Sequence, residues 1–120
     1  MNIVVEGADK LAKQFKGMGK GYRPAVRTAL KKCLLDLKGK AVKLAPIKTS
    51  DLRKSAYTAM ENYAGEVGFA EVYALRQHEE LGYEHPKGGQ AKFLEQPYKE
   101  NIDTYVKWIG DEVLKEILKA

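Results

Sequence analysis

The segment "PAVRTALKKCLLDLKGKAVKLA", residues 24–45, has the strongest helical pattern in the N-terminal half of the chain. Its apolar positions recur with the 3.6-residue period of an α-helix and are Val26, Leu30, Cys33, Leu34, Leu37, Ala41 and Leu44. Pro24 suits the first turn of a helix, because the N–H that it lacks has no partner there. Pro46 disfavours helical geometry at the residue before it, so the helix is predicted to end near Ala45.

The positions between these apolar residues are largely basic: Arg27, Lys31, Lys32, Lys38, Lys40 and Lys43. A lysine-rich polar face is the common way to solvate an amphipathic helix. The same lysines could contact phosphates, although base reading favours bidentate arginine. Cys33 is the only cysteine, so an internal disulfide is excluded, and its position predicts a thiol packed in the core.

Upstream, "NIVV" (residues 2–5) is a short β-type run that ends at Glu6-Gly7. In residues 8–18, Leu11, Phe15 and Met18 follow one another at helical spacings, which predicts a first amphipathic helix. The glycines and the proline of "GMGKGYRP" predict a flexible connector between the two helices.

Downstream, "PIKTSDLRKS" (residues 46–55) is predicted to be a polar loop, in which Arg53 holds the turn by pairing with an acidic residue. Residues 55–61 and 66–70 favour β-structure and are predicted to form a hairpin with its turn at residues 62–65. After Pro97 the chain closes with an amphipathic helix. The expected apolar face of that helix consists of Ile102, Val106, Ile109, Val113 and Ile117, bordered by Tyr105, Trp108 and Leu114.

This order of elements predicts a single α+β domain over residues 1–120. Two N-terminal helices and a long C-terminal helix are expected to pack on a small antiparallel sheet that contains the hairpin. The expected core residues are Leu30, Leu34, Leu37, Phe69, Phe93, Ile102, Val106 and Ile109.

The segment "YALRQHEELGYEHPKGGQAKFLEQP", residues 73–97, raises the question of a metal site. A zinc-protease helix needs histidines at positions i and i+4, but Gly82 stands four residues after His78. His85 and an adjacent glutamate could still complete a metal site in a loop, as in a metal-dependent hydrolase. The glycines and the proline instead favour a flexible loop at residues 82–92 that contacts a neighbouring protein.

Charge is divided unevenly along the 120 residues, whose net charge is +5. Residues 1–60 carry 14 Lys/Arg and 4 Asp/Glu, whereas residues 61–120 carry 7 and 12. Such asymmetry is typical of a nucleic-acid surface or of unlike faces that attract between subunits. The sequence has neither a membrane-spanning apolar run nor a signal-peptide pattern, so the protein is expected to be made and kept in a cytoplasm, or packaged from one.

Three segments, two patterned segments and the closing helix after Pro97, resemble those of a protein family, the small head–tail joining proteins of long-tailed bacteriophages, also called neck, tail-completion or minor capsid proteins. The loop pattern "P-x-x-T-G-x-L-R-x-S" is matched at Pro46, Thr49, Leu52, Arg53 and Ser55, with Ser50 in place of the usual glycine. The pattern "YA-x-x-x-E-x-G … F-L-x-P" is matched at Tyr73, Ala74, Glu79 or Glu80, Gly82, Phe93, Leu94 and Pro97. The order of elements agrees over about residues 3–118.

The resemblance implies a structural, non-enzymatic component of the virion neck with no cofactor, membrane or small-molecule substrate. Such proteins form a homo-oligomeric ring that joins the DNA-filled head to the tail, beside head connector and tail proteins and near packaged DNA. The residues expected to contact subunits or partners are Thr49, Arg53, Lys31, Lys32, His78, Glu79, Tyr83, His85, Lys87 and Lys92. The alternatives are a basic nucleic-acid-binding module and a metal-dependent hydrolase that uses His78 and His85.

Overall fold

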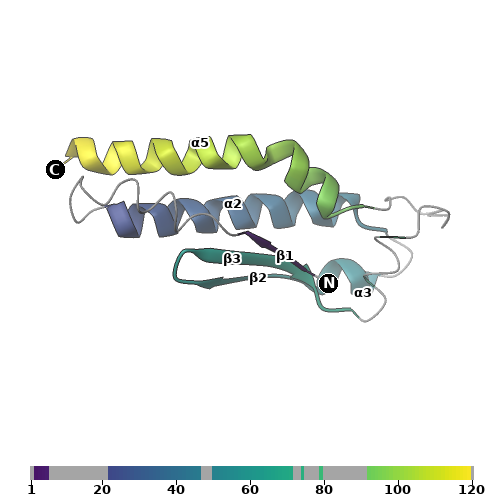
Figure 1. Cartoon of the computed structure of the whole chain (residues 1–120). Helices are drawn as coiled ribbons and strands as arrows, with labels where there is room; N and C mark the ends of the chain where they lie inside the picture. Colours follow the sequence, from purple (N-terminus) through teal and green to yellow (C-terminus); the bar gives the residue numbers. More distant parts are fainter. Residues whose placement is uncertain are drawn as a thin grey trace.

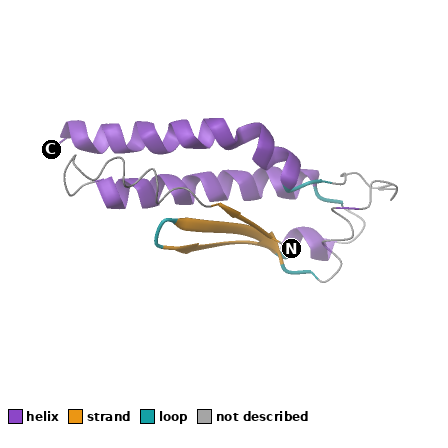
Figure 2. Ribbon diagram, viewed as in Figure 1, coloured by secondary structure: helices purple, strands orange, loops and turns teal. Residues whose placement is uncertain are grey.

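The computed structural model of the chain describes residues 2–5, 22–46, 50–71, 74, 79 and 92–119. They form a mixed helix-and-sheet fold (Figures 1 and 2). Its elements are β1 (Asn2–Val5), α2 (Tyr22–Leu44), α3 (Ser50–Lys54), β2 (Ala56–Glu61), β3 (Ala64–Phe69) and α5 (Glu95–Lys119). The first predicted helix, at residues 8–18, and all but the last residue of the predicted loop at 82–92 lie outside the described residues.

The three strands form one antiparallel sheet with the order β1-β3-β2. Glu61 pairs with Ala64, which leaves a two-residue turn at Asn62 and Tyr63. Asn62 has a φ of 51°, a left-handed conformation that asparagine tolerates better than most residues. The predicted hairpin is confirmed, but its turn is shorter than residues 62–65 because the ladder of strand pairs continues to Ala64.

The elements are stacked in three layers, with α2 between the sheet and α5 (Figure 1). α2 and α5 run antiparallel and are about 35 and 38 Å long, as expected for 23 and 25 helical residues. The six-residue strands span only about 20 Å. The molecule is therefore elongated, at 53 × 21 × 19 Å, and both long helices extend beyond the sheet.

The core lies on both sides of α2, as its apolar pattern predicts. Six of the expected core residues are buried: Leu30, Leu34, Leu37, Phe69, Phe93 and Ile109. Phe69 of β3 and Phe93, just before α5, meet edge to face with ring centroids 4.9 Å apart. This aromatic contact joins the sheet to the start of the last helix.

The prediction that the other two residues, both on α5, belong to the core is wrong. Val106 is 49% exposed and Ile102 is only partly buried. The buried face is instead centred on Tyr105, Ile109 and Val113, which follow one another at intervals of four residues. Tyr105 can be buried because its hydroxyl has a hydrogen-bond partner in Asp36. Val106, the next residue, lies about 100° further round the helix and therefore faces outward.

The segment predicted to be a polar loop contains the short helix α3 at Ser50–Lys54. Leu52, in its middle, is only 1% exposed and belongs to the core. A helical turn pairs part of the local backbone while this side chain is buried, which an open loop would not do. The loop prediction at this position is therefore wrong.

Candidate interaction surfaces

The structure describes five of the residues expected to make contacts, and they lie in three places. Lys31 and Lys32 are exposed on α2, and Arg53 is on α3. Glu79 and Lys92 contact each other beside the start of α5. The remaining residues of that set, Thr49, His78, Tyr83, His85 and Lys87, lie outside the described residues.

Arg53 caps the C-terminal end of α2. Its Nε donates a hydrogen bond to the carbonyl oxygen of Ala45 (3.0 Å), and its Nη2 donates to the carbonyl oxygens of Ala45 (2.7 Å) and Lys43 (3.0 Å). The last carbonyls of a helix lack intrahelical partners and carry partial negative charge, so a guanidinium suits them. Backbone carbonyls thus stand where an acidic partner was expected.

The other described residues of the two sequence patterns are also used inside the fold. Ser55 Oγ donates a hydrogen bond to the carbonyl oxygen of Leu52 at 2.7 Å. The buried members of the patterns are Pro46, Leu52, Ala74, Phe93, Leu94 and Pro97. The buried and hydrogen-bonded members of these patterns among the described residues therefore serve the fold.

An ion-pair cluster connects Glu79 to the start of α5. Lys92 contacts the Glu79 carboxylate and lies 3.4 Å from the carboxylate of Glu95, which also pairs with Lys99 at 2.9 Å. The hydrogen bond to Glu79 raises the pKa of Lys92, and those from Lys99 and Lys92 lower the pKa of Glu95. Salt and solvent screen exposed ion pairs of this kind, so the cluster adds little to the stability of the domain.

The exposed side of α2 is basic around an apolar centre. Leu35, near its middle, is 50% exposed, and Lys31 lies one turn before it. The basic residues on this side include Arg27, Lys31, Lys38 and Lys43. The one acidic residue of α2, Asp36, is turned towards α5. Lys32 is also drawn towards α5, because its ammonium lies 4.7 Å from the ring centroid of Trp108 in a cation–π contact.

α5 carries a second apolar stripe outside its buried face. Val106, Leu114 and Leu118 are 49%, 55% and 77% exposed, and Gly110 lies midway between the first two. The helix contains six acidic and four basic residues, whereas α2 contains one acidic and seven basic residues. The two long helices therefore differ in charge, and each leaves apolar side chains uncovered.

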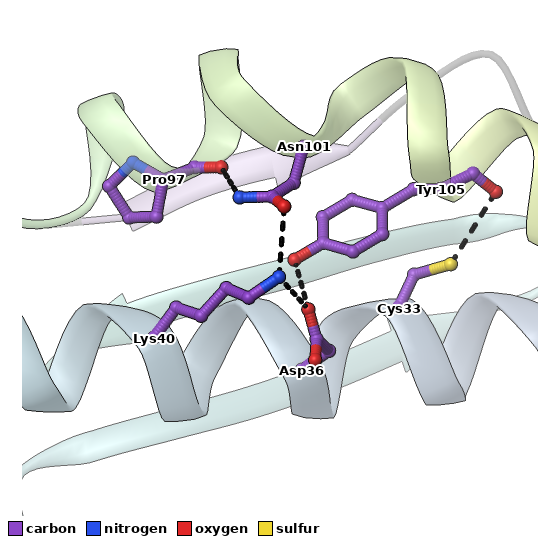
Figure 3. A network of polar contacts seen from close by, with 6 residues as sticks. All are labelled: Cys33, Asp36, Lys40, Pro97, Asn101 and Tyr105. Atoms are coloured by element: carbon purple, nitrogen blue, oxygen red, sulfur yellow. Dashed lines mark hydrogen bonds and ion pairs between the residues drawn. The ribbon is translucent and has the colours of Figure 1, made fainter.

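A polar network lies between the buried sides of these helices (Figure 3). The Tyr105 hydroxyl donates a hydrogen bond to Asp36 Oδ2 at 2.7 Å, and Lys40 Nζ lies 2.8 Å from the same oxygen. Lys40 Nζ also donates to Asn101 Oδ1 at 2.8 Å, and Asn101 Nδ2 donates to the carbonyl oxygen of Pro97 at 2.7 Å. Because these groups find their partners in one alignment of the helices, the network fixes how α5 is placed along α2.

The protonation states of this network are set by burial and by its hydrogen bonds. Burial acts to raise the pKa of Asp36, but the hydrogen bonds from Lys40 and Tyr105 outweigh it and hold the pKa below 3.8. Burial and the same carboxylate raise the pKa of Tyr105 far above its ordinary value. Burial also raises the pKa of the Cys33 thiol to about 11. At neutral pH Asp36 is therefore charged and Tyr105 is neutral, and Cys33 is a packed, unreactive thiol as predicted.

Within the described part of the chain, no group of three or more His, Cys, Asp and Glu side chains is placed to hold a metal ion. None of the helices described there combines the length and apolar character needed to cross a membrane. Comparisons of the chain with protein-family models, with curated proteins and with solved structures found no match. The exposed surfaces of α2 and α5 are therefore the features that bear on function.

The residues expected to make contacts are polar or aromatic, so that set lacks Leu35, Leu114 and Leu118. A signal for Leu35 does exist in the sequence. It falls outside the helical period of Leu34 and Leu37, and an apolar residue out of phase with the core stripe cannot be buried by the same core. Among the described residues, Leu35 is the one large apolar side chain exposed on α2, whereas Val106, Leu114 and Leu118 are aligned on α5. Such an alignment distinguishes a contact surface from a single exposed leucine.

Proposed function

We propose that the protein is a non-enzymatic structural component of a bacteriophage neck, which assembles into a homo-oligomeric ring between the DNA-filled head and the tail. Its partners are further copies of itself and the adjacent head connector and tail proteins. The proposal includes the finer α+β architecture that the order of elements predicts, with two N-terminal helices on the small sheet. The observation that carries it is that α2 and α5 expose apolar residues on surfaces that differ in charge.

A ring subunit needs two different contact surfaces, because each copy meets the next through unlike faces. The basic side of α2 around Leu35 and the acidic helix α5 with Leu114 meet this requirement within one elongated domain. Opposite charges orient the encounter of two copies, and apolar contact supplies affinity once water is excluded. The charge division between the two halves of the sequence has the same sense.

Particles produced with and without the gene test this function. We expect the protein in purified tailed particles at a fixed copy number, and we expect its deletion to leave DNA-filled heads and separate tails. Mass spectrometry of purified particles and electron microscopy of the deletion lysate give these two results. Complete tailed particles in the deletion lysate would refute the proposal.

Non-specific nucleic-acid binding is the second candidate, since the exposed side of α2 bears several basic residues and no acidic one. Binding of this kind needs only positive charge and weakens steeply with salt. Leu35 at the centre of the surface disfavours nucleic-acid binding, because an apolar side chain contributes nothing to phosphate contact.

Titration of a fluorescent DNA duplex between about 50 and 200 mM salt separates the two candidates. Nanomolar binding that falls by orders of magnitude over this range supports the binding module. Weak binding at the lowest salt supports the neck component, which meets DNA only inside an assembled particle.

A further inference from the structure

We propose that the exposed face of α2 in one copy docks on the exposed face of α5 in a second copy. This inference rests on the proposed function and names the contact between its subunits. The α2 face is defined by Lys31, Leu35, Lys38, Gly39 and Val42. The α5 face is defined by Val106, Gly110, Leu114 and Leu118, with Asp103, Lys107, Asp111 and Lys115 beside them.

The apolar part of the α5 face is the longer of the two. Residues 106–118 of α5 extend over about 18 Å, whereas residues 35–42 of α2, from Leu35 to the partly buried Val42, extend over about 10 Å. Leu114 and Leu118 are more than half exposed, and Leu35 is half exposed. Laid along each other, the stripes remove these side chains from water, which is favourable in proportion to the apolar area covered.

Each face also contains a glycine. Among the described residues, a Cβ added at Gly39 or at Gly110 would meet nothing within 4 Å. Glycine in a helix interior lowers stability relative to alanine, and no packing within the described part of the chain explains this cost. Gly39 lies one turn after Leu35, and Gly110 lies midway between Val106 and Leu114. In the proposed contact these two positions let the helices approach closely.

Charge disfavours the pairing of two α2 faces. The α2 face contributes Lys31 and Lys38 and no acidic residue. On the α5 face, Asp103 and Asp111 alternate with Lys107 and Lys115, while α5 as a whole carries six acidic and four basic residues. Two α2 faces brought together would repel each other, whereas α5, with its net negative charge, does not repel an α2 face.

The contact is heterologous, because its two faces lie on different helices of the same molecule. Repeated from copy to copy, it closes into a ring or continues as a filament. Its apolar centre is at most about 18 Å long and one helix wide, far below the roughly 800 Å² per partner of a stable pair. Two free copies therefore associate weakly, and the contact becomes stable when neighbours in the particle hold many copies together.

Disulfide crosslinking of the purified full chain tests this arrangement. Leu35→Cys protein is mixed with Leu114→Cys protein under mild oxidation at high concentration, and the products are separated without reductant. The matched control replaces the Leu114→Cys partner with Ala59→Cys, which places an exposed cysteine on β2, away from both faces. The native Cys33 is 4% exposed, so the wild-type protein serves as a silent background.

We expect the Leu35→Cys and Leu114→Cys pair to crosslink about tenfold faster than the control pair at low salt, with the excess falling as salt rises. The double variant should give a ladder of multimers. Equal rates for the two pairs, or Leu114→Cys alone crosslinking as fast as the mixture, would overturn the proposed contact.

A second pair of variants tests the close approach of the helices. Gly110→Leu adds a side chain to the α5 face at a position where a Cβ meets nothing within 4 Å, and we expect it to abolish the excess crosslinking while the helix content stays unchanged. Thr104→Leu, an exposed α5 position outside the stripe, should leave the excess unchanged. Undiminished crosslinking with Gly110→Leu would contradict the contact.

The outcome can be distinguished from failure of the proposed function. If deletion of the gene blocks head–tail joining while crosslinking does not exceed the control, the neck function stands and the subunit contact lies elsewhere. If crosslinking succeeds and deletion leaves tailed particles intact, the chain self-assembles through these faces in another role.

Discussion

On the side of α2 that faces the sheet the contacts are apolar, whereas on the side that faces α5 apolar packing is combined with a polar network. At the sheet, Leu34 packs directly over Gly65, where an added Cβ would lie 2.5 Å from Leu34 Cδ1. Val67 and Phe69, on the same face of β3, are fully buried. At α5, Ile109 and Val113 are buried beside the hydrogen bonds of Asp36 and Tyr105.

The difference between the two sides of α2 shows that stability and alignment come from different contacts. Apolar burial removes surface from water and supplies most of the stability, but it tolerates small displacements. A network such as Asp36, Lys40, Asn101 and Tyr105 adds less net stability, because each group also loses hydration, but its geometry is satisfied in one alignment. The alignment of α5 decides which of its residues face outward, and therefore the composition of the exposed stripe.

The largest effect is expected at the sheet side, from Leu34→Ala. This side chain is 1% exposed, so its truncation leaves a cavity and should lower the free energy of unfolding by about 2–5 kcal/mol. The matched control is Leu35→Ala, the next residue, which is 50% exposed and should cost less than about 1 kcal/mol. Urea unfolding followed by circular dichroism measures both. Similar losses for the two leucines would show that α2 is oriented differently.

A second test adds a methyl group to the same contact. Gly65→Ala places a Cβ within 3.0 Å of three atoms of the buried Leu34 side chain, and we expect destabilisation by about 1–3 kcal/mol. The control is Gly39→Ala, where nothing lies within 4 Å and the better helix former should stabilise by about 0.5–1 kcal/mol. Opposite signs in thermal unfolding are the expected result. A stabilising Gly65→Ala would contradict the close packing of Leu34 on the sheet.

Elements with strong local signals could be predicted from the sequence. The helix predicted over residues 24–45 is observed at Tyr22–Leu44. Its signals are local, because the apolar period lies within the segment and the two prolines lie near its ends. The strand at Asn2–Val5 and the hairpin were likewise recognisable from β-favouring residues next to turn residues. The turn was predicted two residues too long, because glycine is typical of turns, whereas Gly65 is paired in β3 and lies under Leu34.

Features that depend on distant partners could not be predicted in this way. The buried face of α5 includes Tyr105 because Asp36 lies opposite it, 69 positions earlier in the chain. Arg53 binds the carbonyl oxygen of Ala45, and carbonyls are present at every position, so the sequence does not reveal the partner. On the candidate surfaces, Lys31 and Lys32 were expected from their charge, while Leu35 was missed although it falls outside the core period.

The polar side should respond less than the sheet side, and cooperatively. Tyr105→Phe removes the hydrogen bond to Asp36 and should cost about 1 kcal/mol. In a double-mutant cycle with Asp36→Asn, we expect the two losses to be non-additive by about 0.5–1 kcal/mol. The control is Tyr57→Phe, whose hydroxyl donates to Glu66 at 3.0 Å on a more exposed surface and should cost less. Strict additivity at Asp36 and Tyr105 would mean that the hydrogen bond contributes nothing in solution.

The smallest expected effect is a pH dependence that only the polar side shows. Burial acts to raise the pKa of Asp36, but hydrogen bonds from Lys40 and Tyr105 hold it below 3.8, so the folded state binds this proton less readily than the unfolded state. The stability from Asp36 is therefore fully present above the unfolded pKa and is lost as pH falls through the folded pKa.

The difference in unfolding free energy between wild type and Asp36→Asn should accordingly be largest near neutral pH and shrink as pH falls below about 4. Glu95, whose pKa is lowered by Lys99 and then Lys92, is present in both proteins and cancels in the difference. The loss caused by Leu34→Ala involves no titrating group, so it should stay constant over the same range. Urea titrations at a series of pH values measure the losses caused by Asp36→Asn and Leu34→Ala. A loss from Asp36→Asn that does not change with pH would show that the charge of Asp36 does not contribute to the alignment of α5.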